Sequence, residues 1–174
     1  MLKIFVNTWG NYNENGADGG QWVNLPMDPD DLEETLENIA AAMGDNDPEW
    51  AIHDYEWGDT FDGGEISECD NIQDINEYAQ RLEDLDKWDL KKYAAMIEYW
   101  GSKCVDIDDI DDYNLYSDIE TDYDLGYYWA QESGCYDLSN MGHLANYIDY
   151  ESFGRDIRFE SDGGFTSYGW IERC

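Results

Sequence analysis

The chain has 174 residues, of which 42 are acidic and nine are basic, and its formal net charge at pH 7 is −33. This charge disfavours direct binding to nucleic acid and to anionic membrane surfaces, because both are themselves negatively charged. Aromatic residues make up 16% of the chain. Long acidic disordered tails lack them, so we expect a folded protein.

The basic residues are unevenly placed along the chain. Twenty acidic residues and no basic one lie between Lys3 and Arg81, and thirteen lie between Lys103 and Arg155. Most carboxylates therefore have no partner of opposite charge within the chain. An acidic helix face often serves only solubility, but solubility needs a net charge of only about 2–8. We therefore expect the surplus charge to be used by a binding partner.

The first section, residues 1–60, predicts a small sheet with one helix. Residues 2–7, 21–26 and 49–57 are β-rich runs, and the Gly/Asn-rich segment 13–20 predicts a loop. Alternation along the third run would place Trp50, Ile52 and Asp54 on one face.

A helix is predicted after the second of these strands. Asp28 is a suitable N-cap, Pro29 suits the first helical position, and Gly44 suits the C-terminus. An apolar stripe follows the helical period at Leu32, Leu36, Ile39 and Met43. Five acidic residues fall largely outside this stripe: Asp30, Asp31, Glu33, Glu34 and Glu37.

The remaining sequence predicts a helical middle at 61–103 and a mixed section at 104–174. The middle carries two helical patterns, at 71–85 and 88–101. The last section predicts a strand at 113–117, helices at 122–134 and 144–154, and a hairpin of 155–160 with 165–172. The fold class is therefore α+β, in three small consecutive sub-domains.

The segment 105–124 concentrates acidic charge between residues that pack. Nine of its twenty residues are Asp or Glu, and isoleucine, leucine and tyrosine separate them. Duplex DNA carries one charge per about 1.7 Å of axis, so 33 charges correspond to about 56 Å of duplex. We interpret the acids of this segment and of the first helix as phosphate surrogates that bind a partner. Those of the segment are Asp106, Asp108, Asp109, Asp111, Asp112, Asp118, Glu120, Asp122 and Asp124.

No pattern of catalytic or metal-binding residues stands out. The sequence has no GxSxG, P-loop or HExxH motif, and His53 and Asp54 are neighbours that a strand would point to opposite faces. Two segments place acidic residues at the spacing of an EF-hand calcium loop, but both lack the glycine that the sharp turn of that loop needs. We expect no enzyme activity, cofactor or metal. The four cysteines are far apart and without CxxC, which favours buried free thiols in a cytoplasmic protein.

Three blocks of the sequence resemble the ArdA-type antirestriction proteins: FVNTWGNYNENGADGGQWVNLPMD at 5–28, EWAIHDYEW at 49–57 and LANYIDYESFGRDI at 144–157. The resemblance implies an elongated DNA mimic in three parts that forms a homodimer through its C-terminal part. It also implies binding to the DNA-binding subunits of type I restriction–modification enzymes and origin in a mobile genetic element or a bacterium. The antirestriction motif described for this family would fall at residues 136–150.

Three other interpretations of the acidic composition remain open. A halophilic protein of unrelated function would also be rich in Asp and poor in Lys, and would need molar salt to fold. An acidic inhibitor of another basic nuclease would be a compact monomer. An enzyme would need a site that the sequence does not display.

Overall fold

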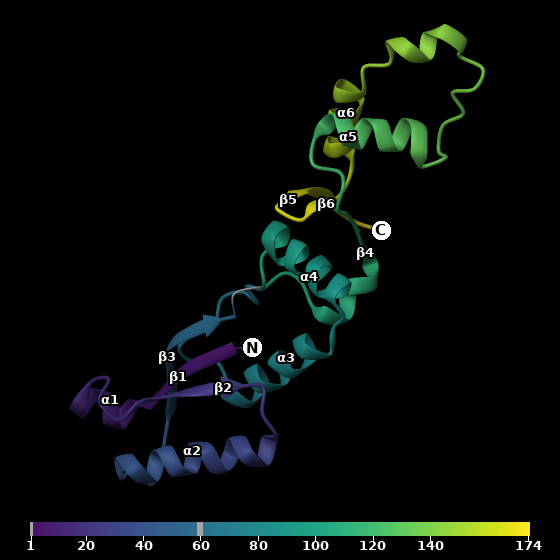
Figure 1. The fold of residues 1–174 in the computed structure, drawn as a ribbon. Helices are drawn as coiled ribbons and strands as arrows, with labels where there is room; N and C mark the ends of the chain where they lie inside the picture. The colour runs from purple at the N-terminus through teal and green to yellow at the C-terminus, as the bar shows by residue number, and fades with distance from the viewer. Residues whose placement is uncertain (1, 59–60) are drawn as a thin grey trace. The chain divides into compact units, whose positions relative to one another are not determined.

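The protein is described by a computed structural model that covers residues 2–58 and 61–174 (Figure 1). Backbone contacts divide the chain into two compact units, Met1–Asp86 and Lys87–Cys174. Each unit contains a three-stranded antiparallel sheet together with helices, which confirms the α+β class. The division into three sub-domains at 1–60, 61–103 and 104–174 stays a prediction, and the two units are described in turn.

The sheet of the first unit has the strand order β2-β1-β3, with both pairs antiparallel. Its strands are β1 (Leu2–Thr8), β2 (Gln21–Leu25) and β3 (Trp50–Trp57), as predicted. Leu2, Ile4 and Val6 of the central strand are fully buried at every second position, because side chains alternate between the two faces of a strand. These three residues are the contribution of the central strand to the hydrophobic core.

A β-bulge in β3 overturns one detail of the prediction. The register of β3 against β1 shifts by one residue at His53, so that the alternation of faces changes there. Ile52 is buried and Trp50 packs against the same core, as predicted, but Tyr55 takes the inward place expected for Asp54. Asp54 is exposed on the other face.

A short helix, α1 (Trp9–Asn15), follows β1 and replaces the first part of the loop predicted at 13–20. Its sequence is rich in Asn and Gly, which are poor helix formers. Thr8 caps it by accepting a hydrogen bond from the backbone N–H of Asn11 at 3.1 Å. The buried Asn7 donates to the Gly16 carbonyl and accepts from the Asn11 side chain. These side-chain hydrogen bonds stabilise a helix that the intrinsic propensity of its residues does not favour.

Helix α2 (Pro29–Met43) begins and ends where the sequence predicts. The Asp28 carboxylate accepts a hydrogen bond from the backbone N–H of Asp30 at 2.9 Å, and Gly44 closes the helix with a φ of 76°, a conformation that suits glycine. Leu32, Leu36 and Ile39 are buried against the sheet and are part of the core.

Helix α3 (Ile72–Asp84) completes the first unit and is capped by Asn71. Its Asn76 is buried and exchanges two hydrogen bonds with the backbone of Met27, at 2.9 and 2.8 Å. A buried amide is tolerated only when it is paired in this way. The pairing joins α3 to the segment that leads into α2.

The sheet of the second unit has the strand order β4-β6-β5, again antiparallel. Its strands are β4 (Tyr113–Tyr116), β5 (Gly163–Thr166) and β6 (Gly169–Arg173). Helix α4 (Lys87–Trp100) packs against it through four buried residues, Tyr93, Ala94, Ala95 and Met96. Trp170 of the central strand is fully buried.

Two helices pack against each other beyond this sheet (Figure 1). Helix α5 (Asp122–Tyr127) continues into a π-helical turn, Tyr128–Glu132. Helix α5 packs against α6 (Tyr150–Glu160). The position of α6 differs from two of the predictions. The helix predicted at 144–154 is a 3₁₀ helix (Gly142–Tyr147) followed by α6, because Asp149 caps a new helix start.

The strand predicted at 155–160 is also wrong. These residues are the second half of α6, where Phe153 and Ile157 are one turn apart and Ile157 packs, partly buried, against the core. Their apolar and charged residues alternate over too short a stretch to separate a strand from a helix. The hairpin is formed instead by β5 and β6.

Candidate functional site

Helix α2 carries the first group of predicted site residues on its solvent face. Asp30, Asp31, Glu33, Glu34 and Glu37 are all exposed. They are fixed in position because the opposite face of the helix is buried in the core and both helix ends are capped. The structure therefore brings these five carboxylates together on one rigid element.

The second group lies on a 3₁₀ helix, η1 (Ile107–Asp112). Such a helix has three residues per turn, so positions i and i+3 lie above each other. Ile107 is buried and Ile110 is half-buried on one side, which turns the remaining positions to solvent. Four carboxylates are exposed there, Asp108, Asp109, Asp111 and Asp112, and Asp106 is exposed beside them.

Asp106 also determines where η1 begins. Its carboxylate accepts a hydrogen bond from the backbone N–H of Asp108 at 3.1 Å, which satisfies a donor that the helix start would otherwise leave open. The acidic cluster and the start of the helix are therefore specified by the same residues.

The acidic residues after β4 fall into two classes. Asp118 and Glu120 are exposed, whereas Asp122 and Asp124 are half-buried and have partners within the fold. The guanidinium of Arg158 on α6 donates to both oxygens of Asp122, at 2.7 and 3.2 Å. The hydrogen bond from Arg158 to Asp122 raises the pKa of Arg158 above its ordinary value. This ion pair joins α5 to α6.

Asp124 has its partner at the start of α5. Its carboxylate accepts hydrogen bonds from the backbone N–H and hydroxyl of Thr121, at 3.1 and 2.6 Å. The backbone N–H of Asp124 donates in return to the Thr121 hydroxyl at 3.1 Å. This reciprocal arrangement is a capping box, so Asp124 stabilises the helix start.

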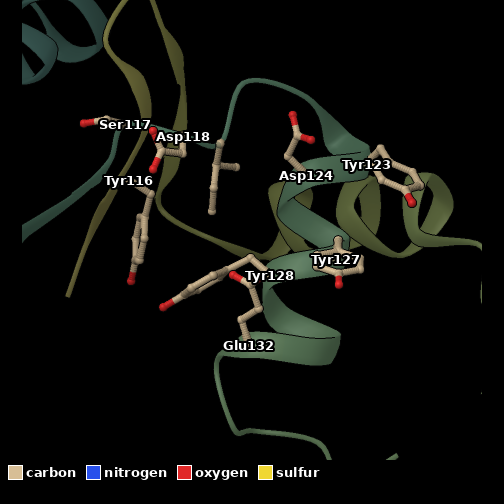
Figure 2. A pocket seen from close by; sticks show the side chains of 9 residues that line it. Tyr116, Ser117, Asp118, Tyr123, Asp124, Tyr127, Tyr128 and Glu132 are labelled. Carbon is tan, nitrogen blue, oxygen red and sulfur yellow. The ribbon is translucent and has the colours of Figure 1, made fainter.

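A tyrosine-lined cavity of about 620 Å³ opens between the end of β4 and α5 (Figure 2). Its lining consists of Tyr116, Ser117, Asp118, Ile119, Tyr123, Asp124, Tyr127, Tyr128 and Glu132. The sequence indicated tyrosines only as residues that anchor the acidic segment to a core. Their spacing at 123 and 127, one helical turn apart, was the available signal for a shared aromatic face.

Tyr116, at the end of β4, lines this tyrosine-lined cavity. Its ring lies 5.1 Å from that of Tyr128, centroid to centroid. Burial raises the pKa of the Tyr116 phenol far above its ordinary value, and the negative charge of Glu172 raises it further. Glu172 itself is buried and accepts a hydrogen bond from the indole N–H of Trp170 at 3.0 Å. Both effects favour the phenol of Tyr116 over its phenolate.

The segment 136–150 carries large apolar side chains on the surface of the second unit. Leu144 and Tyr147 are 66% and 84% exposed, and Tyr136 and Met141 are exposed as well. Phe159 at the end of α6 is 73% exposed. Isolated exposed apolar side chains are ordinary, and these five all belong to the second unit.

The histidine considered as a catalytic candidate has a structural environment. His53 stacks on Tyr12 with ring centroids 4.1 Å apart, and its Nδ1 lies 3.1 Å from a carboxylate oxygen of Glu68. The carboxylate of Asp54 accepts a hydrogen bond from the backbone N–H of Tyr55 at 2.9 Å instead. The two neighbouring side chains are engaged by different groups.

The described part of the chain holds neither a metal-binding cluster nor a membrane-spanning helix. Within residues 2–58 and 61–174, no group of three or more His, Cys, Asp or Glu is placed to hold a metal ion. Nor does that part contain a helix of the length and apolarity needed to cross a membrane. All four cysteines are free and exposed, which corrects the expectation that they are buried.

The sequence matches one protein family. The family model described as antirestriction protein (ArdA) matches residues 4–172. The match includes α2, η1 and the whole tyrosine-lined cavity, and it confirms the resemblance seen in the three sequence blocks. No curated protein matches this chain.

Proposed function

Because the chain belongs to the ArdA family of antirestriction proteins, we propose that it inhibits type I restriction–modification enzymes by occupying the groove in which they bind DNA. Incoming DNA is then protected from restriction. The observation that carries this proposal is the row of closely spaced, exposed carboxylates on each of α2 and η1.

The density of charge on these rows is close to that of DNA. An α-helix rises about 1.5 Å per residue, so the acids from Asp30 to Glu37 cover about 10 Å of axis, roughly one charge per 2 Å. A 3₁₀ helix rises about 2.0 Å per residue, so those from Asp108 to Asp112 have a similar density. Duplex DNA carries one charge per about 1.7 Å. A groove that attracts phosphates attracts such rows by the same electrostatics.

The rows are also held in place before the partner arrives. Each stands on a helix whose opposite face is buried, and each helix start is capped by an aspartate, Asp28 or Asp106. Binding then costs little ordering entropy in the backbone. Of the fourteen proposed surrogates, Asp122 and Asp124 are half-buried, so we expect them to contribute less than the twelve exposed ones.

We further propose a homodimer that forms through the C-terminal part of the chain. The large exposed side chains Leu144, Tyr147 and Phe159 support this, because burying them between two copies would remove apolar surface from water. An elongated dimer would extend the acidic surface over a longer stretch of the enzyme's groove. Small-angle scattering would test the shape, and a near-spherical monomer would favour inhibition of some other basic nuclease.

The proposed partner is a bacterial cytoplasmic enzyme, and the protein would be brought into the cell by a mobile genetic element. Inhibition requires no catalytic residue, cofactor or metal ion in this scheme. Nucleic acid is a competitor and not a ligand, because the surface repels phosphates.

The deciding experiment is a titration of a purified type I enzyme with the protein in a DNA cleavage assay. We expect inhibition that is relieved when the concentration of the substrate duplex is raised, since the protein and the DNA use one groove. A basic nuclease of a different class serves as the control enzyme. Inhibition that no amount of duplex relieves, or equal inhibition of both enzymes, would contradict the proposal.

A further inference from the structure

The tyrosine-lined cavity combines aromatic faces with carboxylates in one hollow (Figure 2). Its walls come from the end of β4, the loop that follows it, α5 and the π-helical turn, all within the second unit. It lies beside the acidic segment of the proposed function, but its tyrosines are not explained by charge mimicry alone.

Two tyrosines present a pair of nearly parallel rings. Tyr123 and Tyr127 are one helical turn apart, with ring centroids 6.4 Å apart and planes inclined by 16°. The ring of Tyr150 on α6 contacts both edge-on, at 5.6 and 5.3 Å. These contacts orient the two rings, although both side chains are substantially exposed.

The charges around these rings have one sign. Asp118 and Glu132 are exposed at the cavity and Asp124 lines it. The faces of aromatic rings are also negative, because of the ring quadrupole. Phosphates and other anions are therefore disfavoured, and a cation gains from both the carboxylates and the ring faces.

We propose that this cavity receives the guanidinium group of an arginine from the partner enzyme, an inference that rests on the proposed function. A guanidinium is planar and weakly hydrated, so it stacks on aromatic faces more readily than the ammonium group of lysine. It also donates two parallel hydrogen bonds to a carboxylate. Arginine is common in DNA-binding grooves because it forms the same paired hydrogen bonds with phosphates.

The cavity and the acidic rows would then have different roles. The rows attract the basic groove over a distance, whereas a filled aromatic cavity acts only at contact and distinguishes a protein side chain from a counterion. Arginines and tyrosines of this kind carry a large share of the affinity in many interfaces. Tyr116 lines the same cavity, and its phenol oxygen can accept a hydrogen bond from a guanidinium.

The first test compares Tyr127→Leu with Tyr127→Phe in binding to the type I enzyme. The phenylalanine variant keeps the ring face, so its affinity should equal that of the unchanged protein, whereas the leucine variant should bind about 2-fold to 30-fold more weakly. Glu132→Gln should also weaken binding. Trp22→Leu, at an aromatic residue of similar exposure (44% against 41%) in the first unit, is the control and should have no effect.

The second test uses the free ligand chemistry on the full chain. Nuclear magnetic resonance would follow a titration with N-acetyl-arginine amide, and with the citrulline amide as its uncharged analogue. Shifts should saturate and concentrate on Tyr116, Tyr123, Tyr127 and Tyr128 with the arginine probe alone. Shifts spread evenly over α2 and η1, or equal shifts with citrulline, would overturn the proposal.

The two tests separate this inference from the proposed function. If the unchanged protein inhibits the enzyme and DNA competes, but Tyr127→Leu and Glu132→Gln bind normally, the cavity proposal is wrong and the charge mimicry stands. If the protein does not inhibit a type I enzyme, the proposed function fails. If, in addition, the arginine probe does not shift the resonances of the cavity tyrosines, the cavity proposal is rejected as well. Unfolding curves of each variant show whether a loss of binding reflects a loss of fold.

Discussion

Gly126 of α5 and Gly154 of α6 lie backbone against backbone. A β-carbon added to Gly126 would collide with the carbonyl oxygen of Tyr150 and approach the Gly154 nitrogen to 2.7 Å. One added to Gly154 would collide with the carbonyl oxygen of Asp122 and approach the Gly126 nitrogen to 2.6 Å. The two helices pack this closely because neither carries a side chain at the contact, and the Asp122–Arg158 ion pair lies beside it.

We predict that Gly154→Ala destabilises the protein. In an ordinary helix interior this change stabilises by up to about 1 kcal/mol, but here the helices must separate, which costs about 1–3 kcal/mol or more. Gly10→Ala in α1 is the control, because an added β-carbon there meets no backbone atom and contacts only side-chain oxygens, of Asp45 at 3.2 Å and of Thr8 at 3.9 Å. Urea unfolding measures both, and a Gly154→Ala variant as stable as the unchanged protein would show that the helices are not so close.

The start of α6 should depend on pH through Asp149. Hydrogen bonds from the backbone N–H and hydroxyl of Ser152 hold the pKa of this carboxyl below its ordinary value. Folding therefore favours the ionised form, and the cap stabilises the helix above the ordinary pKa of the carboxyl. That stability is lost as the pH falls through the lowered pKa of the folded state.

A pH titration followed by nuclear magnetic resonance checks the Asp149 prediction directly. Ser152→Ala should move the pKa of Asp149 up towards its ordinary value. Asp149→Asn should keep the cap, since Asn is also a good N-cap, but remove its dependence on pH. An unshifted titration of Asp149 in the unchanged protein would contradict the capping geometry.

Moderate salt should stabilise the fold. Repulsion among the carboxylates opposes folding, and salt at about 0.1–0.15 M screens exposed charges beyond about 8–10 Å. Lys3 and Arg81 are the only basic residues in the sequence of the first unit, so repulsion there has little compensation. Thermal melts should show a rising midpoint between low salt and 0.3 M NaCl. A flat or falling midpoint would argue against repulsion as a major cost, and a need for molar salt would favour a halophilic protein.

The elements that could be predicted from the sequence are those with explicit end signals. Helix α2 has an Asp cap, a proline at its first position and a terminal glycine, and it begins and ends accordingly. Helix α1 lacks such composition and depends on Asn7, whose bonds to Asn11 and Gly16 form only once the chain has turned. The bulge at His53 likewise arises from pairing between strands, which a single strand's alternation does not contain.

The candidate site shows the same division. Exposure of the acids on α2 follows from the helical period, because the apolar stripe determines which face is buried. The pairing of Asp122 with Arg158 could not be predicted, since Arg158 lies 36 residues away in a segment whose pattern predicts a strand. The tyrosine-lined cavity needs Tyr116 of β4 opposite Tyr128, a contact between elements that local patterns do not specify.

Self-association should depend on the exposed apolar residues of the second unit. Leu144→Glu and Tyr147→Glu each place a charge where a second copy would bury an apolar side chain, which is costly without a partner charge. We expect the unchanged protein to be a dimer and the double variant a monomer in light scattering coupled to size-exclusion chromatography. Trp22→Glu is the control for added charge in the first unit. A dimer that survives both substitutions would place the interface elsewhere.

Inhibition should be distributed over many carboxylates. If each exposed acid replaces one phosphate, each contributes about 0.2–1 kcal/mol, so Asp109→Asn alone should barely weaken binding to a type I enzyme. Neutralising the whole cluster should cost far more, about 1–5 kcal/mol if the terms add. The cluster consists of Asp106, Asp108, Asp109, Asp111 and Asp112. Asparagine suits this test because it keeps the cap that Asp106 provides for η1.

A matched control separates position from net charge in this last prediction. Five exposed acids on α3 and just beyond it can be neutralised instead: Asp74, Glu77, Glu83, Asp84 and Asp86. Neutralising these five acids removes the same number of charges, but they are not among the proposed surrogates. This variant should therefore bind more tightly than the η1 variant in the same titration. Equal losses would mean that only the total charge matters. A single substitution on η1 that abolished inhibition with the fold intact would mean that a discrete site replaces distributed mimicry, because no one phosphate surrogate can carry the binding of a whole row.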